Sequence, residues 1–491
     1  MNLESQDSKI VDALLFLIVL TLCFNNVHVL DRFPHAKIVG PYGQSLFWFP
    51  LASALVYTAW CVVRRRIRLA PLLPFAAYAF VLLAVGGVST WLNRGTVVVE
   101  SGLLGFELWQ FKTFALDVFW SLWAVYFIYL WYRGRWRRAL ELAALAVGIM
   151  TVVVILVALI EVVGECGNDG ATKIAYSVEC LASGEWVGAG DEMPLRLYLG
   201  RIQSIFPEPS FLGIWAAGAL PILLARQWNG GFRWHVLTMG LMTLMICSCS
   251  RLAQLSLGVI LLSYLVIAAL ATRTWRKVLV MIAEIIVSTI LAVAIVSNFK
   301  TSFIESLSVA EAAPKQEQPE REQPVSAVGE DVSVYVTGGG MATRLKNCEV
   351  ELRAFRKHLA FGCGYMKIGM TFGDYLKDEE RRQFAEIDEW MCYQENVGPL
   401  VYQVPSFSTV TRVLAEFGLV GAVVVFLPML LIGLLLVRRF VRDCSVESGL
   451  LIVFLLGIAT TFVGWYVLLF LWIFLALGLS LAYLGGDKEC R

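Results

Sequence analysis

The chain has 491 residues, of which 58% are apolar and only 16% are charged, and its mean hydropathy is +0.69. Soluble proteins average about 25% charged residues, so this composition excludes a soluble globular protein and predicts one filled with membrane-spanning segments. The net charge of +1 carries little information, because the charges gather in a few loops. The first apolar run lacks a small-residue cleavage site, and we expect it to be retained as the first span.

About twelve apolar stretches are long enough to cross roughly 30 Å of hydrocarbon as a helix. They lie near residues 10–30, 45–63, 69–91, 109–132, 138–163, 209–227, 232–249, 252–271, 277–298, 408–437, 448–465 and 467–485. Two longer runs, 232–271 and 448–485, exceed one span and break at 247–251 and near Gly464, so each predicts a hairpin. The predicted fold class is therefore an all-α integral membrane protein with about 12 transmembrane helices.

Basic residues cluster in alternate loops, and this pattern predicts the orientation of the chain. The clusters lie at 64–68, 133–138, 226–233, 273–277 and 438–442. Loops of this kind stay in the cytoplasm, so both termini are expected there, and the loops at 164–208 and 300–407 face outward. The predicted organisation is nine spans in 1–299, a large outer loop at 300–407 between spans nine and ten, and three spans with a cytoplasmic tail in 408–491.

The large outer loop opens with a Pro/Glu/Gln-rich stretch, and we expect residues 311–331 to be disordered and dispensable for activity. The glycine run at 338–340 is either a hinge or a place where backbone approaches a ligand closely. A helix-like stretch then leads to His358. Its basic face is either a binding surface or simply a solvated one, and it consists of Lys346, Arg353, Arg356 and Lys357.

The cysteines in the predicted outer loops are placed where disulfides persist. Cys166 and Cys180 share one outer loop and can form a bridge. The other outer loop holds Cys348, Cys363 and Cys392, which allows one bridge and leaves one thiol unpaired. No cysteine spacing suggests zinc, and the histidines are scattered at positions 28, 35, 235 and 358, so we expect no metal centre.

Arg251 stands at the tip of the tight hairpin at 247–251, with apolar spans on both sides. The ordinary interpretation is an interfacial arginine that extends its head to lipid headgroups. A charge at a membrane edge is costly unless it is paired or faces water. A functional role in a polar lining with Ser248 and Ser250 is therefore the alternative interpretation.

In the segment 196–213, Arg196 and Arg201 lead into Pro-Glu-Pro-Ser and then into an apolar span. Ser210 is expected to cap the helix, and Glu208 to lie at its positive end. That purely structural role leaves Arg201 and Gln203 unexplained. With Arg251 and Arg344, Arg201 is predicted to border one outer vestibule, and arginine suits phosphate because its planar fork binds two oxygens at once.

Four segments, in this order, resemble the O-antigen polymerase and ligase superfamily, which includes the Wzy-type polymerases. They are 201–213, Ser250-Arg251, Arg344 ahead of the Phe-Gly-Cys-Gly motif at 361–364, and 414–421 after the large loop. In the last of these, Glu416, Gly418 and Gly421 match the family's Glu-x-Gly-x-x-Gly pattern. Together with the topology, the resemblance covers most of residues 195–440.

This resemblance implies a GT-C-like membrane glycosyltransferase in the bacterial inner membrane. Such an enzyme acts on undecaprenyl-diphosphate-linked glycan at the periplasmic face and needs no nucleotide sugar, metal or other cofactor. In the ligases of the family, arginines matching Arg251 and Arg344 are functional, together with a histidine ahead of the Glu-x-Gly-x-x-Gly pattern. This chain has no histidine at 404–410, so we expect a polysaccharide polymerase, with the ligase as an alternative.

In the polymerase reaction a sugar hydroxyl of one repeat unit attacks the anomeric carbon of a growing chain and expels undecaprenyl diphosphate. The resemblance assigns Arg344 and Arg251 to the diphosphate, and Arg201 as an assisting ligand or a ligand of the acceptor. Glu208 either orients or deprotonates the acceptor hydroxyl or merely begins a helix. Further residues are expected to bind substrate: Arg196, Gln203, Ser250, Arg353, Tyr365 and Glu416. Glu416 alternatively anchors its helix.

Aromatic residues of the outer loops, Tyr365, Trp390 and Tyr393, are candidates for stacking on sugar rings, although aromatic residues are common at membrane interfaces in any case. The family usually works with a chain-length-control protein, and no nucleic-acid partner is expected. Sugar identity and linkage stay open.

A transporter or flippase for the same lipid-linked glycan is the rival class. Lys112, Asp117 and Glu284 lie deeper in predicted spans and would then form an ion or proton path. Two observations favour an enzyme: no inverted pair of Gly/Pro-broken spans is present, and the basic sites cluster at one face.

Overall fold

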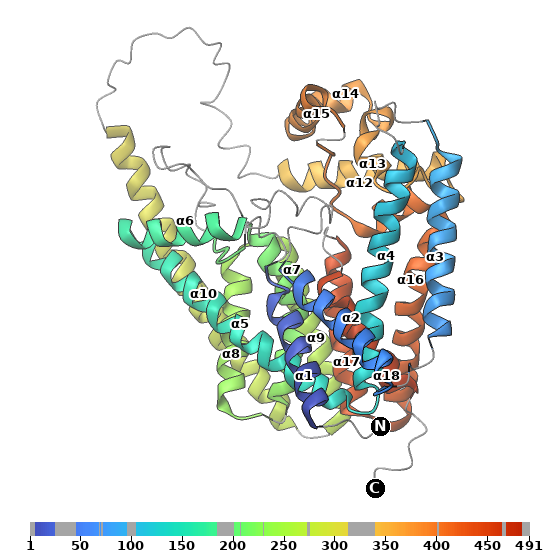
Figure 1. The fold of residues 1–491 in the computed structure, drawn as a ribbon. Helices are drawn as coiled ribbons and strands as arrows, with labels where there is room; N and C mark the ends of the chain where they lie inside the picture. The colour runs from blue at the N-terminus through green and yellow to red at the C-terminus, as the bar shows by residue number, and fades with distance from the viewer. Residues whose placement is uncertain are drawn as a thin grey trace.

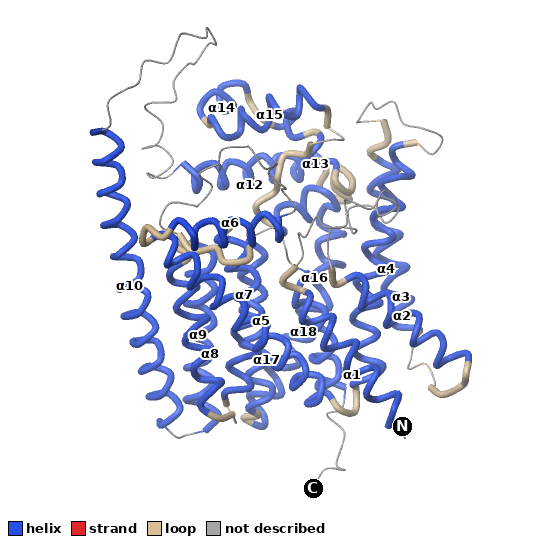
Figure 2. The backbone as a smooth tube through the Cα atoms, turned by 60° about the vertical axis from the view of Figure 1, so that its left-hand side comes forward, coloured by secondary structure: helices blue, strands red, loops and turns tan. Residues whose placement is uncertain are grey.

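The computed structural model describes residues 5–24, 46–67, 69, 72–95, 105–183, 201–206, 208–228, 230–272, 275–312, 339–399, 402–463 and 468–483. Within these ranges every regular element is a helix (Figures 1 and 2). The first part of the bundle contains α1 (Ser5–Thr21), α2 (Trp48–Val63), α3 (Leu73–Leu92), α4 (Phe106–Tyr132), α5 (Trp136–Glu165), α6 (Asp169–Ser183), α7 (Pro209–Gln227), α8 (Phe232–Cys247), α9 (Arg251–Thr272) and α10 (Trp275–Ala312).

The remaining elements are α12 (Gly339–Lys357), α13 (Lys367–Met370), η3 (Phe372–Tyr375), α14 (Asp378–Gln383), α15 (Ala385–Val397), α16 (Thr409–Asp443), α17 (Val446–Thr460), η4 (Thr461–Val463) and α18 (Leu468–Tyr483). A helix lies in each of the twelve apolar stretches that the sequence predicts. The predicted break at 247–251 is confirmed, because α8 ends at Cys247 and α9 begins at Arg251. The large loop begins later than predicted, since α10 continues to Ala312.

The chain is a helical membrane protein. Seven of the described helices are long and apolar enough to cross a membrane: α3, α4, α5, α7, α9, α10 and α16. Four further helices, α2, α8, α17 and α18, are apolar but shorter. The bundle is held together by buried side chains such as Phe127, Tyr132 and Trp215, and many leucine and valine side chains on its outside are exposed, as lipid contact requires.

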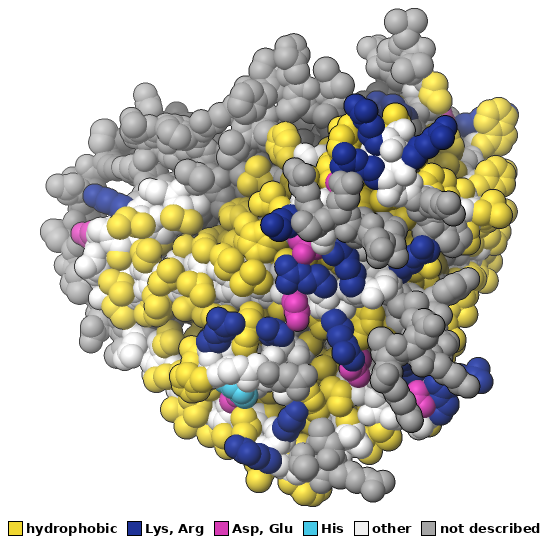
Figure 3. All heavy atoms as spheres, turned by 60° about the horizontal axis from the view of Figure 1, so that its bottom comes forward, with side chains coloured by type: hydrophobic (Ala, Val, Ile, Leu, Met, Phe, Trp, Pro, Cys, Tyr) yellow, Lys and Arg dark blue, Asp and Glu magenta, His cyan; other side chains and the backbone are white. Residues whose placement is uncertain are grey.

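One end of the bundle, called the basic end, gathers the short basic loops around the start of α1. Arg66 pairs with Asp7 at 3.0 Å, and Arg138 pairs with Asp12 at 2.9 Å. Arg439 donates to the carbonyl of Leu481 near the end of α18 at 2.6 Å. Figure 3 shows lysine and arginine side chains spread over this face. The grouping agrees with the predicted alternation of basic loops.

At the opposite end, called the loop end, α6 and α12–α15 lie across or above the bundle (Figures 1 and 2). Residues 359–364 attach this layer to α16. Four backbone hydrogen bonds make the joint: Cys363 N to Ala415 O at 2.7 Å, Gly364 N to Glu416 O at 3.0 Å, Leu419 N to Leu359 O at 2.8 Å and Val420 N to Ala360 O at 3.1 Å. We call this joint the glycine clamp.

Two glycines make the glycine clamp sterically possible. Gly362 has φ +69° and Gly418 has φ +66°, values that favour glycine because it has no Cβ. Gly418 is also non-helical, with ψ −166°, so α16 is broken there. The Phe-Gly-Cys-Gly and Glu-x-Gly-x-x-Gly motifs of the sequence are therefore two halves of one packing joint.

Candidate functional site

The structure brings two of the predicted arginines, Arg201 and Arg251, to one turn at the loop end. The Arg201 guanidinium donates to the carbonyls of Ser248 at 3.2 Å and Cys249 at 3.5 Å, in the turn between α8 and α9. Arg251 is the first residue of α9 and is exposed, and it makes no hydrogen bond or ion pair within the described residues. Its guanidinium is thus available to an anion.

Ser250 acts mainly as a helix cap. Its Oγ accepts a hydrogen bond from the backbone N–H of Ala253 at 3.5 Å, and the side chain is buried. Serine is favoured at this position because its hydroxyl satisfies one of the backbone donors left free at a helix start. The predicted substrate-binding residue Ser250 therefore shapes the turn that carries Arg251.

Glu161 of α5 holds the segment that contains Arg201 and Gln203. Its carboxylate accepts the backbone N–H of Gln203 at 3.1 Å and of Ser204 at 2.9 Å, and all three residues are buried. The Oε1 of Gln203 has no hydrogen-bond partner among the described residues. Sequence reasoning missed Glu161, although a carboxylate near the end of an apolar helix is an uncommon feature that marks such residues.

Glu386 of α15 is affected by the charges of both Glu208 and Arg344. Burial raises the pKa of Glu386; a hydrogen bond with Thr343 and the charge of Arg344 lower it, and the charge of Glu208 raises it. All three side chains therefore lie within electrostatic reach. The Arg344 guanidinium also lies over the ring of Phe407, 5.2 Å from its centroid. Glu386 carried no signal in the sequence beyond being one of many charges in the large loop.

Glu208 occupies the N-cap position of α7, and the predicted cap Ser210 does not. Its backbone is extended, with φ −150° and ψ 153°, and the Ser210 hydroxyl donates to its Oε2 at 2.9 Å. The expectation that Ser210 caps the helix was wrong, because α7 begins at Pro209 and its N-cap is Glu208, two residues before Ser210.

The start of α7 and the start of α9 lie side by side. A Cβ added to Gly213 would lie 3.0 Å from the Cα of Ala253, so the first turns of the two helices are in backbone contact. This contact places Glu208 and Arg251 at the same end of the bundle. Arg344 belongs to α12, one of the helices that lie above the bundle at the loop end, and the starts of α7 and α9 lie at the same end (Figure 1).

A cluster of buried charges lies beside this group, where α12 meets α16. Arg412 pairs with Glu416 at 3.0 Å, and the hydroxyl of Thr411 donates to the carboxylate of Glu351. Burial raises the pKa of Glu351 to about 7, while hydrogen bonds with Ser406 and Thr411 act in the opposite direction. We call Glu351, Thr411, Arg412 and Glu416 the junction cluster. Glu416, predicted to bind substrate or anchor its helix, is buried and pairs with Arg412 one helical turn earlier on α16.

Tyr365, another residue predicted to bind substrate, is packed among other side chains of the protein. Tyr365 lies between Phe114 and Phe417, with ring centroids 5.2 Å and 6.0 Å away, and its hydroxyl donates to Asp117. A ring packed in this way offers no face to a sugar, so that expectation was wrong. Of the other aromatic candidates, Trp390 packs against Phe407 with the rings tilted by 33° and their centroids 5.5 Å apart, and Tyr393 packs edge-on against Tyr402 at 4.8 Å.

Arg353 forms the centre of an ion-pair network on α12. Its guanidinium binds both carboxylate oxygens of Glu380, at 2.5 and 2.6 Å, and also contacts Glu349. Lys346 binds Glu349 at 2.6 Å and Glu380 at 3.1 Å. The hydrogen bonds from Arg353 lower the pKa of Glu380 to about 2. The predicted basic face is therefore largely neutralised, and only Arg356 and Lys357 stay exposed on it.

The deeper charges do not form a continuous path within the described residues. Asp117 accepts from Tyr365, and Glu284 binds His235 and accepts from Gln227 at 2.8 Å. Lys112 is exposed on α4. Each buried carboxylate has a local partner, which is a structural arrangement and weighs against a proton or ion route.

Some predictions concern residues whose placement is not described. Arg196, the side chain of Cys180 and most of the stretch 311–331 lie outside the described residues. Cys166, Cys348, Cys363 and Cys392 are free thiols, so neither expected disulfide is present at these positions. In the described ranges, no group of three His, Cys, Asp or Glu side chains is placed to hold a metal ion.

Comparison with known protein families and curated proteins gives no family for the chain. No model of a known protein family matches it, and no curated protein matches it either. The residues at the loop end are therefore the features from which a function can be inferred.

Proposed function

We propose that the chain is a membrane glycosyltransferase that joins lipid-diphosphate-linked oligosaccharide units into a polysaccharide at the outer face of a bacterial inner membrane. The observation that supports this most is the gathering of Arg201, Arg251 and Arg344 at the loop end, with Glu208 and Glu386 beside them. The short basic loops lie at the other end of the bundle, which is consistent with an outward-facing site.

The arginines suit the leaving group of this reaction. A diphosphate leaves with the electron pair of the broken bond to the anomeric carbon, so negative charge grows on its oxygens in the transition state. Fixed cations placed at such a position lower the barrier without having to reorganise. Arg251 and Arg344 are both exposed and bind the diphosphate. Arg201 donates a hydrogen bond to the turn that precedes Arg251 and thereby positions Arg251.

The carboxylates suit the acceptor. The attacking hydroxyl oxygen forms the new bond to the anomeric carbon and gives up its proton as the diphosphate departs. Glu386 lies within electrostatic reach of both Arg344 and Glu208, so one of the two carboxylates accepts that proton while the arginine holds the phosphate. This arrangement supplies a base from another element where the sequence has no histidine at 404–410.

A ligase would use the same donor and differ only in the acceptor, a lipid in place of another repeat unit. The two activities are therefore distinguished by their products.

The test is a surface-polysaccharide gel from cells that lack the chain and are complemented with wild type, Arg344→Ala, Arg251→Ala or the control Arg356→Ala. Arg356 lies on α12 like Arg344 and is also exposed, about three helical turns further along the helix.

We expect the ladder to collapse to single-repeat product without the chain, and to return with wild type and Arg356→Ala. Arg344→Ala and Arg251→Ala should restore less than about a tenth of the polymer at equal protein amount, since removal of one stabilising group commonly costs a factor of 10²–10³. Accumulation of lipid-linked polymer would instead indicate a ligase. Full activity of both arginine variants would refute the proposed site.

The purified protein provides a second test. It is incubated with undecaprenyl-diphosphate-linked repeat units, and the products are separated by chain length. Release of one undecaprenyl diphosphate per new glycosidic bond is expected for a polymerase. Movement of intact donor across a vesicle membrane without bond formation would support the transporter class.

A further inference from the structure

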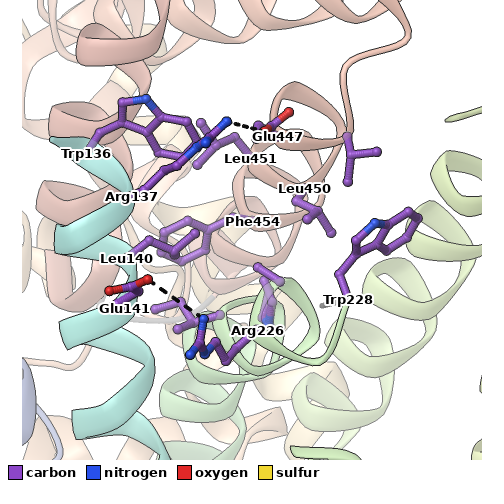
Figure 4. Close-up of a pocket in the computed structure, with 14 residues that line it drawn as sticks. Trp136, Arg137, Leu140, Glu141, Arg226, Trp228, Glu447, Leu450, Leu451 and Phe454 are labelled. Atoms are coloured by element: carbon purple, nitrogen blue, oxygen red, sulfur yellow. Dashed lines mark hydrogen bonds and ion pairs between the residues drawn. The ribbon is translucent and has the colours of Figure 1, made fainter. Parts of the chain in front are cut away.

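A pocket of about 470 Å³ opens at the basic end, far from the arginines of the loop end, between α5, α7 and α17 (Figure 4). Its volume lies in the range typical of small-molecule sites. The walls are apolar, with Leu140, Phe454 and Trp136 among the lining residues. The proposed glycosyl transfer makes no use of this pocket.

Four charged side chains line the pocket as two ion pairs. Arg137 of α5 pairs with Glu447 of α17 at 3.0 Å, and Arg226 of α7 pairs with Glu141 of α5 at 3.9 Å. Figure 4 shows the two pairs with Leu140 and Phe454 between them. Each pair joins different helices, and each arginine engages its carboxylate through a single nitrogen, which leaves most of its five donors unused.

We propose that this pocket binds the headgroup of phosphatidylethanolamine from the membrane leaflet at the basic end. The phosphate is held by Arg137 and Arg226, and the ammonium by Glu141 and Glu447. The apolar walls take the glycerol backbone and the first carbons of the acyl chains.

Charge complementarity selects this lipid among common phospholipids. The pocket lining carries two cations and two carboxylates, which matches a headgroup with one phosphate and one ammonium. An anionic headgroup such as that of phosphatidylglycerol would bring its phosphate to the arginines but offer the carboxylates only neutral hydroxyl donors, without the positive charge of an ammonium. Phosphatidylcholine has the right charges, yet its quaternary ammonium has no N–H to donate.

The first experiment uses only the wild-type protein. The full chain is purified in detergent and offered equal amounts of phosphatidylethanolamine, phosphatidylglycerol and phosphatidylcholine, and retained lipid is counted by native mass spectrometry. We expect phosphatidylethanolamine to be retained about tenfold over either of the others, the factor expected for one hydrogen bond to a charged group. Retention should fall stepwise as the ammonium of the lipid is methylated once, twice and three times. Equal retention of the three lipids, preference for phosphatidylglycerol, or no methylation effect would overturn the proposal.

Matched variants then assign the two halves of the headgroup. Glu447→Gln should bring retention of phosphatidylethanolamine down to that of phosphatidylcholine, and Arg137→Gln should lower retention of both by about tenfold. The control is Arg442→Gln, whose guanidinium pairs with Asp443 at 2.8 Å on α16 and does not line the pocket. Unchanged selectivity in Glu447→Gln, or equal losses in the control, would contradict the assignment.

Discussion

Gly362 and Gly418 each occupy a place where the backbone of the other's segment leaves no room for a side chain. A Cβ on Gly418 would overlap the carbonyl carbon of Ala360, and one on Gly362 would overlap that of Glu416. The close approach allows the four hydrogen bonds of the glycine clamp, which fastens the loop-end helices to the bundle. The joint therefore fastens the segment that follows α12, the helix that carries Arg344, to α16.

We expect Gly418→Ala to destabilise the protein by more than about 2 kcal/mol, because it combines steric overlap with a φ that alanine adopts at a cost of about 1–2 kcal/mol. The measurement is thermal unfolding in detergent. The control is Gly258→Ala in α9, where a Cβ meets nothing within 4 Å and should stabilise the helix by about 0.5–1 kcal/mol. Equal stability of Gly418→Ala and wild type would show that the glycine clamp is dispensable.

The junction cluster predicts a particular pH dependence of stability. Burial raises the pKa of Glu351 from its ordinary value of 4.5 to about 7, so between these values the folded protein binds the proton and the unfolded chain does not. Folding is then favoured at low pH, and the contribution of Glu351 is lost as the pH rises through about 7. The loss approaches about 1.4 kcal/mol per pH unit within this window. We expect Glu351→Gln to flatten this decline, measured as melting temperature against pH.

The control for that experiment is Glu349→Gln on the same helix. Hydrogen bonds with Lys346 and Arg353 lower the pKa of Glu349, so its contribution to stability is present at neutral pH and lost at low pH. The Glu349→Gln variant should leave the decline between pH 4.5 and 7 in place. An unchanged slope in Glu351→Gln would mean that other groups cause it.

Glu161 is expected to act as a positioning residue for Arg201, because it holds the backbone of Gln203 and Ser204. Glutamine in its place keeps the shape but accepts with one oxygen only, so Arg201 becomes less well ordered. On the proposed function, Glu161→Gln should lower polymer synthesis by about tenfold, the cost expected for one charge-assisted hydrogen bond. The effect should appear in the turnover rate more than in the affinity for the lipid donor.

The comparison for Glu161→Gln is Glu165→Gln, one helical turn further along α5. That variant should retain wild-type synthesis. A drop confined to protein abundance, with normal synthesis per molecule, would give Glu161 a purely structural role.

The orientation of the chain can be tested with its own cysteines. Cys392 is exposed at the loop end and Cys444 is exposed at the basic end. If the loop end faces outward, a membrane-impermeant maleimide should label a variant that retains only Cys392 in intact cells. A variant that retains only Cys444 should be labelled only after the cells are opened. The reverse pattern would invert the topology and remove the proposed site from the outer face.

The helices were predicted well because each apolar run carries its own signal. The break between α8 and α9, for example, was read correctly from a polar stretch in a run too long for one span. The extension of α10 to Ala312 was missed, because the residues that continue it are polar enough to suggest a loop. Helix formation there does not depend on apolar content.

The roles of individual polar residues were predicted less well. Arg353 and Tyr365 had the right chemistry for substrate, yet their partners Glu380 and Asp117 were not apparent from the sequence. Glu161, Glu386 and Arg412 were missed for the same reason. A charged residue in a sequence does not say whether it will meet an opposite charge, a carbonyl or solvent.

The sequence by itself determined that this is a helical membrane protein and where its helices lie. It also determined that arginines lie in the loops next to the helix ends. These properties depend on local composition and on the length needed to cross a bilayer. Only the tertiary structure decided which of those charges are neutralised and which stay available. Ion pairs such as Arg353 with Glu380, and charge interactions such as that of Arg344 with Glu386, join residues distant in the chain. The packing of separate helices brings such partners together, and local composition does not determine that packing.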